Sequence, residues 1–196
     1  MKKPISELKK DIIFEEHLRD YHFTFHSTWG LFSPHHVDEG TRLFIEQMTI
    51  GEHDTVLDVG CGYGVIGIVA AKLAEKGHVH MVDKDFVAVE YAKKNAELNK
   101  VSNSEIYLSN GLGNVPNSAQ FDVILSNLPA KPEREFFDIL LADAKEHLKP
   151  NGKLYVVTIN GLREFIKRNF TDVFGNYDKL KQGEKYTVAM AQKNSG

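Results

Sequence analysis

A glycine-rich loop beside a carboxylate is the part of this sequence whose residue types and spacing most clearly predict chemistry. The loop follows a short apolar run and contains Asp58, Gly60, Cys61, Gly62, Tyr63 and Gly64. Glycines at alternate positions let the backbone turn sharply and let a ligand approach closely. The helix expected after the loop presents free backbone N–H groups at its start. We therefore expect a cofactor here, although a tight turn between a strand and a helix is an alternative use of the same glycines.

Two kinds of cofactor compete for this loop. Gly62, Gly64 and Gly67 match the spacing of the dinucleotide fingerprint. However, Asp58 would lie at the strand end, where its charge would repel an anionic pyrophosphate and attract the cationic ammonium group of a methionine. The sequence therefore favours S-adenosylmethionine, which carries a sulfonium and an ammonium group but no phosphate. Asp58 can at the same time accept from backbone N–H groups of the loop.

Polar residues after the next two strands extend the predicted cofactor site. Asp83 ends the second strand, which places it beside a ribose, and its carboxylate could accept from both ribose hydroxyls. Asp85 is better explained as the cap of a helix that begins near Phe86. Asn110 follows the third strand and either contacts the adenine amino group or is simply a turn residue.

The turn formed by Asn127, Leu128, Pro129 and Ala130 is the second motif that predicts chemistry. The lone pair of an exocyclic amine is delocalised into its ring, and two acceptors can orient it toward a methyl group. Asn127 offers a carboxamide oxygen and a backbone carbonyl, and the fixed φ of Pro129 would hold the carbonyls in place. The turn predicts transfer by alignment and electrostatics more than by a strong base. Alternatively, it merely ends a strand.

An alternation of strands and helices must position these residues. We expect strands at residues 55–59, 79–83, 106–108, 122–126 and 153–159, and a final hairpin made of 176–180 and 185–191. Helices are expected at 37–48, 64–75, 86–98, 133–148 and 162–170. This alternation implies right-handed βαβ units in a mostly parallel sheet, which binds ligands beyond the carboxyl ends of its strands. The segments 60–64, 83–85 and 127–130 should therefore lie along one edge.

Four segments of the chain together match the motifs of a known family. They are residues 57–67, residues 126–129, residues 109–110, and residues 23–25 with 30–34. They resemble, in that order, the cofactor loop, the Asn-Pro-Pro tetrapeptide, the adenine-side segment, and the N-terminal hairpin with its Phe-Ser-Pro turn. The family is the small-domain family of ribosomal RNA guanine-N2 methyltransferases, within class I of the S-adenosylmethionine-dependent enzymes. The resemblance runs from about Tyr21 to Gln192.

The resemblance implies both a fold and a function. The fold would be Rossmann-like, with a seven-stranded, mostly parallel sheet, a C-terminal antiparallel hairpin and helices on both faces. The function would be S-adenosylmethionine-dependent methylation of an exocyclic amine, most specifically guanine N2 of ribosomal RNA. The catalytic residues would be Asn127, Leu128 and Pro129. The cofactor-binding residues would be Phe32, Asp58, Gly60, Cys61, Gly62, Tyr63, Gly64, Asp83, Lys84, Asn110, Gly111 and Asn127.

The sequence departs from the family pattern at the predicted catalytic turn. Leu128 stands where the family has its first proline, and Ala130 stands where it has a bulky residue, which alters one wall of the base pocket. Two alternatives therefore stay open: a protein glutamine or DNA adenine N-methyltransferase, and a non-catalytic methyltransferase-like RNA-binding protein. If the chain is an active amine methyltransferase, we expect the substitution Leu128→Pro, which restores the pattern, to be tolerated.

The chain is expected to consist of a helical arm at residues 1–20 and one methyltransferase domain at 21–196. Residues 5–20 are interpreted as a short amphipathic helix or arm, residues 21–26 as a strand, and residues 21–34 as the N-terminal hairpin. We expect a monomer or weak homodimer that grips a large substrate without the family's auxiliary second domain. Tyr21, Trp29 and Phe32 either stack on an unstacked base or pack the hairpin.

Composition restricts the class of protein further. The 196 residues carry a net charge of −3, which argues against coating nucleic acid by bulk charge but leaves room for an RNA substrate held by a local basic patch. No apolar run approaches the ~20 residues of a membrane helix. Because Cys61 is the single cysteine, no internal disulfide is possible, and we expect a cytoplasmic protein. No carboxylate converges in sequence on the pairs His22/His26 and His78/His80, so we expect no metal site.

Overall fold

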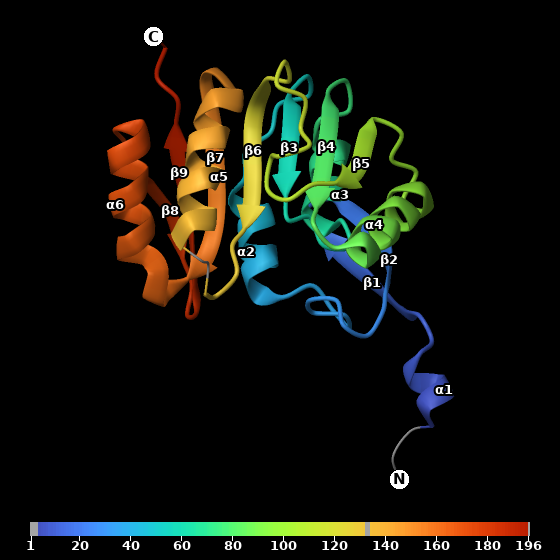
Figure 1. Ribbon diagram of the computed structural model, residues 1–196. Coiled ribbons are helices and arrows are strands. Elements are labelled where there is room, and N and C mark those ends of the chain that lie inside the picture. Colours follow the sequence, from blue (N-terminus) through green and yellow to red (C-terminus); the bar gives the residue numbers. More distant parts are fainter. Residues whose placement is uncertain (1–3, 132–133, 196) are drawn as a thin grey trace.

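The computed structural model describes residues 4–131 and 134–195, in which strands alternate with helices along most of the chain (Figure 1). The strands are β1 Ile12–Leu18, β2 Tyr21–Ser27, β3 Thr55–Val59, β4 His78–Asp83, β5 Ser104–Leu108, β6 Phe121–Asn127, β7 Leu148–Ile159, β8 Asp178–Gln182 and β9 Tyr186–Gln192. The helices are α1 Ile5–Leu8, α2 Glu39–Gln47, α3 Val65–Leu73, α4 Phe86–Leu98, α5 Arg134–His147 and α6 Arg163–Phe174, with a 3-10 turn at Asn160–Leu162.

One sheet of seven strands forms the centre of the molecule, in the order β5-β4-β3-β6-β7-β9-β8. The first five of these strands are parallel, and β9 pairs antiparallel with both β7 and β8. The predicted sheet, including its C-terminal antiparallel hairpin, is therefore confirmed. The elements expected from residue 37 onward also form, although their bounds shift by several residues in places. The expected first residue of α5, Glu133, lies outside the described residues.

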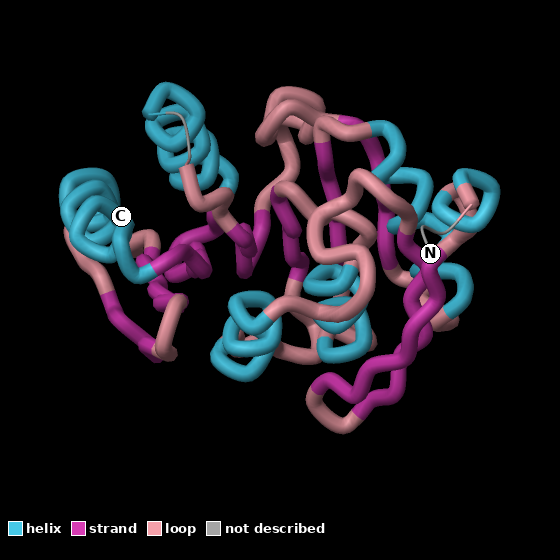
Figure 2. Tube along the Cα trace, turned by 90° about the horizontal axis from the view of Figure 1, so that it is seen from below, coloured by secondary structure: helices cyan, strands magenta, loops and turns pink. Residues whose placement is uncertain are grey.

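Helices cover both faces of this sheet, as Figure 2 shows in a view along the strands. Every residue of β3 after Thr55 is buried, as expected for a parallel strand covered on both sides. Val56 belongs to the cluster formed with α2, α3 and α4, whereas Leu57 belongs to the cluster formed with α5 and α6. Burial of each large apolar side chain in such a layer contributes about 1.5–3 kcal/mol. The two layers hold the carboxyl ends of the strands in fixed positions.

The N-terminal segment differs from the expectation. Helix α1 covers only Ile5–Leu8, and Ile12–Leu18 is a strand that pairs antiparallel with β2. The reason is the two-residue period of burial in β1, in which Ile12, Phe14 and Leu18 face inward and alternate with exposed residues. The interpretation of residues 5–20 as helical was therefore wrong beyond Leu8. The strand predicted at 21–26 is confirmed, but the hairpin spans 12–27 rather than 21–34, and residues 28–37 form a loop.

That loop runs from the hairpin to α2 below the carboxyl ends of the central strands in Figure 1. It begins beside α4, against which β2 packs, and ends at Asp38, whose side chain caps α2. Along the part of the chain that the structure describes, no helix has the length and apolar character needed to cross a membrane.

Candidate cofactor and methyl-transfer site

The three predicted strand-end segments do lie along one edge of the sheet. Strands β4, β3 and β6 are neighbours and run parallel, with Asp58 opposite Met81 on one side and Leu125 on the other. Residues 60–64, 83–85 and 127–130 follow the ends of these three strands, at the lower edge in Figure 1. The parallel register therefore brings the glycine loop, Asp83 and Asn127 to the same edge.

Asp58 is a fully buried carboxylate without a charged partner among the described residues. Its exposed fraction is 0%, and neither of its oxygens has a partner there at normal hydrogen-bond distance and angle, although the backbone N–H of Gly67 approaches the group. Burial raises the pKa of Asp58 to about 7; the backbone N–H of Gly67 opposes this rise, and the nearby Asp83 carboxylate adds to it. A buried charge without a partner is strongly unfavourable. This position is therefore suited to a cationic group that arrives with a ligand.

The glycine loop leaves open space next to this carboxylate. Gly60 and Gly62 have φ values of +74° and +56°, and a Cβ atom at either would meet no heavy atom within 4 Å. Gly67 is different, since a Cβ atom there would lie 2.4 Å from the Met81 side chain, so its glycine permits close packing of α3 on the sheet. The open space at these glycines and the nearby carboxylate, which has no charged partner among the described residues, fit S-adenosylmethionine, whose methionine ammonium group would then lie toward Asp58.

Asp83 organises the loop from the end of β4. Its Oδ2 accepts from the Gly62 N–H at 2.9 Å, and its Oδ1 accepts from the Asp85 N–H at 2.9 Å. Asp85 in turn accepts from the Val87 N–H at 2.8 Å and caps α4, as predicted. Each carboxylate oxygen of Asp83 keeps a further lone pair for a ligand hydroxyl. Its predicted contact with the ribose stays a prediction that this geometry permits.

Substitution of Asp83 by alanine is expected to weaken binding of S-adenosylmethionine by about 2–4 kcal/mol, because charge-assisted bonds to the ribose would be lost. Isothermal titration calorimetry measures this change. Asp85→Ala is the matched control, since it removes a carboxylate at the same edge that caps α4, and it should lower stability without changing affinity. An unchanged dissociation constant for Asp83→Ala would mean that Asp83 does not face the ribose.

The other predicted cofactor residues lie around the same edge. The side chains of Lys84 and Asn110 are exposed, and Gly111 has a φ of +57°. Cys61 is buried, and burial together with the Asp58 and Asp83 carboxylates raises the pKa of its thiol. A neutral buried thiol is a poor nucleophile. The structure therefore leaves Cys61 the role of a small residue in a tight loop.

The loop at 28–37 is anchored directly to the glycine loop. The hydroxyl of Tyr63 donates to the Ser33 carbonyl at 3.1 Å, and the Tyr63 ring packs against Phe14 and Phe25 of the hairpin. The neighbouring ring of Phe32 is 68% exposed. Phe32 thus stands on a loop that is fixed next to the predicted cofactor position.

Asn95 is a structural residue of the site that the sequence analysis missed. It is fully buried on α4, and its Nδ2 donates to the carbonyls of Tyr63 and His26, both at 2.9 Å. Its Oδ1 accepts from the His26 N–H at 2.7 Å. Asn95 therefore ties the hairpin, α4 and the glycine loop together. The signal in the sequence was a polar residue within the apolar stripe of Val89, Ala92 and Ala96.

Asn127 is the last residue of β6, and the NH2 group of its carboxamide is hydrogen-bonded. Its Nδ2 donates to the hydroxyl oxygen of Thr41 at 2.9 Å, and the Thr41 hydroxyl donates to Asp38 at 2.6 Å. Among residues 4–131 and 134–195, the side chain of Asn127 makes this hydrogen bond through Nδ2, and no donor reaches its Oδ1. The carboxamide oxygen thus stays available as an acceptor, as the predicted chemistry requires.

The side chain of Leu128 lies in the core, whereas the family pattern implied a place at the wall of the base pocket. Its side chain is 4% exposed and belongs to the core beneath α5 and α6, while its N–H donates to the Val157 carbonyl at 3.0 Å. The side chain therefore does not form a wall of a base pocket, and a catalytic role is left to the backbone carbonyl. Leu128→Pro would remove this hydrogen bond and the core contact, so we now expect it to be destabilising rather than tolerated. Pro129 and Ala130 are exposed.

The aromatic residues that were candidates for base stacking separate into two kinds. Trp29 is 65% exposed and Phe32 is 68% exposed, so both can receive a base. Tyr21 is partly buried, packs against the core of the hairpin and donates its hydroxyl to the Lys72 carbonyl at 3.3 Å. Packing is therefore the role of Tyr21, whereas stacking stays a prediction for the other two.

A carboxylate lies beside a histidine of each pair, contrary to the expectation: Asp11 Oδ2 lies 3.4 Å from Nδ1 of His26, and Glu105 lies beside His78 and His80. Glu105 on β5 is the register partner of His80, and the ligand atoms of His78, His80 and Glu105 lie within 4.8 Å of one another. Contacts between strands cannot be read from sequence spacing, which is why this group was missed. It lies toward the start of β4, away from Asn127, and so it takes no part in the predicted transfer.

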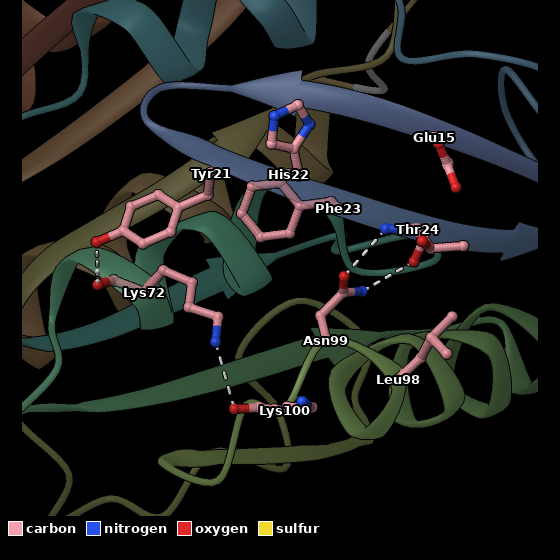
Figure 3. A pocket seen from close by; sticks show the side chains of 9 residues that line it. All are labelled: Glu15, Tyr21, His22, Phe23, Thr24, Lys72, Leu98, Asn99 and Lys100. Carbon is pink, nitrogen blue, oxygen red and sulfur yellow. Dashed lines mark hydrogen bonds between the residues drawn. The ribbon is translucent and has the colours of Figure 1, made fainter.

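An open pocket of about 450 Å³ lies between the hairpin and the C-terminal ends of α3 and α4 (Figure 3). Asn99 bridges to the backbone of Thr24 there, and the Lys72 ammonium donates to the Lys100 carbonyl. None of the residues predicted to bind cofactor or to act in catalysis lines it. This pocket is therefore separate from the site at the strand ends.

Comparison with known proteins places this site in a family. The model of the methyltransferase small domain matches residues 22–190. The uncharacterized protein YbxB of Bacillus subtilis is 39% identical over 141 residues, covering 71% of this chain and 70% of YbxB. Ribosomal RNA large subunit methyltransferase G of Shewanella amazonensis is 31% identical, covering 84% of this chain and 44% of that protein.

Similarity extends to a solved structure, the 16S rRNA N2 G1207 methyltransferase (RsmC) of T. thermophilus in complex with AdoMet and guanosine. It superposes with a TM-score of 0.85 at 25% identity, covering 94% of this chain and 51% of RsmC. The chain thus spans about half the length of the ribosomal RNA methyltransferases that it matches. It belongs to the methyltransferase small domain family, with the Rossmann-like fold and the S-adenosylmethionine cofactor of that family.

Proposed function

We propose that this protein methylates an exocyclic amine of RNA, specifically the N2 amine of a guanine in ribosomal RNA. The observation that carries the proposal is the placement of Asn127 at the same edge as the glycine loop. Its Nδ2 donates to Thr41, and among residues 4–131 and 134–195 no donor reaches its Oδ1. The names of two relatives support the choice of substrate, since both are ribosomal RNA methyltransferases and one acts on a guanine N2.

Asn127 and the turn after it would supply the alignment that this reaction needs. When bound, S-adenosylmethionine supplies the methyl group from its sulfonium and leaves as a neutral thioether. The Oδ1 of Asn127 and a backbone carbonyl of the turn would accept from the two N–H groups of the target amine, which points its lone pair out of the ring plane. The nitrogen loses one proton to solvent after the new bond forms. Alignment and electrostatic complementarity carry this mechanism, and no side chain has to act as a strong base.

Exposed aromatic side chains near the glycine loop support an RNA substrate. A base in structured RNA must leave its stack before it can reach Asn127. Trp29 and Phe32 lie on the loop that Tyr63 anchors, and both rings are largely exposed. Stacking on such rings is worth about 1–3 kcal/mol per base and does not depend on sequence. These residues can therefore hold a base that has been turned out of its helix.

The departure from the family pattern at Leu128 does not count against catalysis. Because the Leu128 side chain is in the core, its replacement of a proline leaves the acceptors of Asn127 in place. Methylation of a protein glutamine or of a DNA adenine would use the same acceptors. Each of these two alternatives is an enzyme that methylates a different substrate. A non-catalytic RNA-binding protein, in contrast, would bind RNA without transferring a methyl group.

Transfer of tritium from labelled S-adenosylmethionine to unmodified ribosomal RNA, followed by nucleoside analysis, tests the proposal. We expect label in N2-methylguanosine, and ribosomal RNA already methylated by the protein serves as the control. Label in protein glutamine or in DNA adenine would replace the proposed substrate. Cofactor binding without transfer to any RNA, DNA or protein would favour the non-catalytic alternative.

A further inference from the structure

We propose that Thr41, held by Asp38, is a positioning residue that fixes the carboxamide of Asn127 with its oxygen toward the target amine. The inference rests on the proposed function. Asp38 caps α2: its Oδ1 accepts from the Thr41 N–H at 3.1 Å, and its Oδ2 accepts from the Thr41 hydroxyl at 2.6 Å. The hydroxyl oxygen of Thr41 then accepts from Nδ2 of Asn127 at 2.9 Å. Three side chains thus form one directed chain of hydrogen bonds.

The direction of this chain follows from the donors that each group has. A carboxylate offers only acceptors, so the single hydroxyl proton of Thr41 points to Asp38. The lone pairs of the same hydroxyl are then the only groups left for Asn127, and only the NH2 of the carboxamide can satisfy them. A flipped carboxamide would place its oxygen against another acceptor. Asp38 and Thr41 together therefore decide which end of the Asn127 amide faces the site.

Packing keeps the chain of hydrogen bonds rigid. Thr41 is 6% exposed, and the residue before it, Gly40, leaves no room for a side chain, since a Cβ atom there would lie 2.8 Å from the ring of Tyr186. The first turn of α2 is therefore pressed against β9. Because buried polar groups in close-packed surroundings cannot shift without losing partners, the orientation of Asn127 is set before a substrate arrives.

The substitution Thr41→Val tests this role, because valine keeps the shape of threonine but cannot accept from Asn127. We expect kcat to fall by about 10–100-fold, since a misaligned acceptor loses rate in this range. The KM for RNA and the dissociation constant for S-adenosylmethionine should stay within about threefold, because the contact acts on the transition state. Thr41→Ser keeps the hydroxyl and should keep kcat within about threefold.

The matched control is Thr187→Val. Thr187 is a buried threonine on β9 whose hydroxyl donates to the Oδ1 of Asn160 at 2.7 Å, so its loss removes an equivalent hydrogen bond elsewhere. It should lower thermal stability about as much as Thr41→Val does, without the drop in kcat. In a double-mutant cycle, Thr41→Val should cost almost nothing in an Asn127→Ala background, since the two residues act as one unit. Equal kcat values for Thr41→Val and Thr187→Val would overturn the proposal.

A readout independent of turnover separates this proposal from the proposed function. The side-chain amide signals of Asn127 in a ¹⁵N spectrum can be assigned by their loss in Asn127→Ala. In the wild type one proton of this pair should exchange slowly, and in Thr41→Val it should exchange about five to ten times faster because its acceptor is gone. Unchanged exchange would show that Thr41 does not hold the amide. If the wild type transfers no methyl group to RNA while this exchange result holds, the proposed function fails and the anchoring of Asn127 by Thr41 stands.

Discussion

Replacement of Asn127 by alanine is expected to lower the rate of methyl transfer by about 10²–10³-fold, which is the usual cost of losing one polar contact at a developing charge. The carboxamide oxygen of Asn127 is the acceptor that Thr41 leaves free, and alanine has none. Affinity for S-adenosylmethionine should stay within a few fold, since Asp58, Asp83 and the glycine loop provide the predicted cofactor contacts. The loss should therefore appear in kcat rather than in cofactor binding.

Single-turnover transfer to ribosomal RNA and calorimetric titration of the cofactor measure the two halves of this prediction. A second variant, Asn127→Asp, keeps the shape of the side chain but cannot donate to Thr41, and its carboxylate would face the acceptors of Thr41 and Asp38. We expect it to be as slow as Asn127→Ala. Full turnover in Asn127→Ala would contradict the proposed mechanism, and a parallel loss of cofactor affinity would place Asn127 in cofactor binding instead.

The central sheet could be predicted from the sequence because its signals are local. Buried parallel strands appear as short apolar runs such as Thr55–Val59, and their helices as periodic segments between glycine and proline signals. The N-terminal strand β1 was missed because its apolar residues also suit a short helix, and only pairing with β2 decides between the two. Tertiary contacts overrode the local preference there.

The residues of the candidate site likewise fall into those that the sequence predicts and those that only the structure connects. The glycine loop, Asp83 and Asn127 are detectable because each stands at a strand end, a position that the alternation of elements predicts. Thr41 could not be connected with Asn127, since the two residues are 86 positions apart, and the place of Leu128 in the core depends on the pairing of β6 with β7. The long-range hydrogen bonds that orient the site thus needed the structure, whereas its chemistry did not.

Asp58 couples cofactor binding to pH, because its native pKa of about 7 lies well above the ordinary value of 3.8. Between about pH 4 and 7, the cofactor-free native protein holds a proton that the unfolded chain has released. The free energy of unfolding therefore falls as pH rises through this range, by at most ~1.4 kcal/mol per pH unit. Pairing with an ammonium group needs the charged form, so cofactor affinity should change in the opposite sense and rise as the pH approaches 7.

The substitution Asp58→Asn should separate these two effects, because asparagine has nearly the same shape but no charge to lose or gain. We expect affinity for S-adenosylmethionine to fall about 100-fold at pH 8, from the loss of one charge-assisted contact of about 1.5–3 kcal/mol. The cofactor-free variant should nevertheless unfold at a higher temperature than the wild type at that pH, since it no longer buries a carboxylate that has no charged partner in the part of the chain that the structure describes. Calorimetric titrations from pH 6 to 8 in buffers of different ionisation enthalpy should detect proton release on binding to the wild type and none for the variant. Equal affinity of the two proteins, or wild-type binding that does not change with pH, would show that Asp58 pairs with no cation of the cofactor.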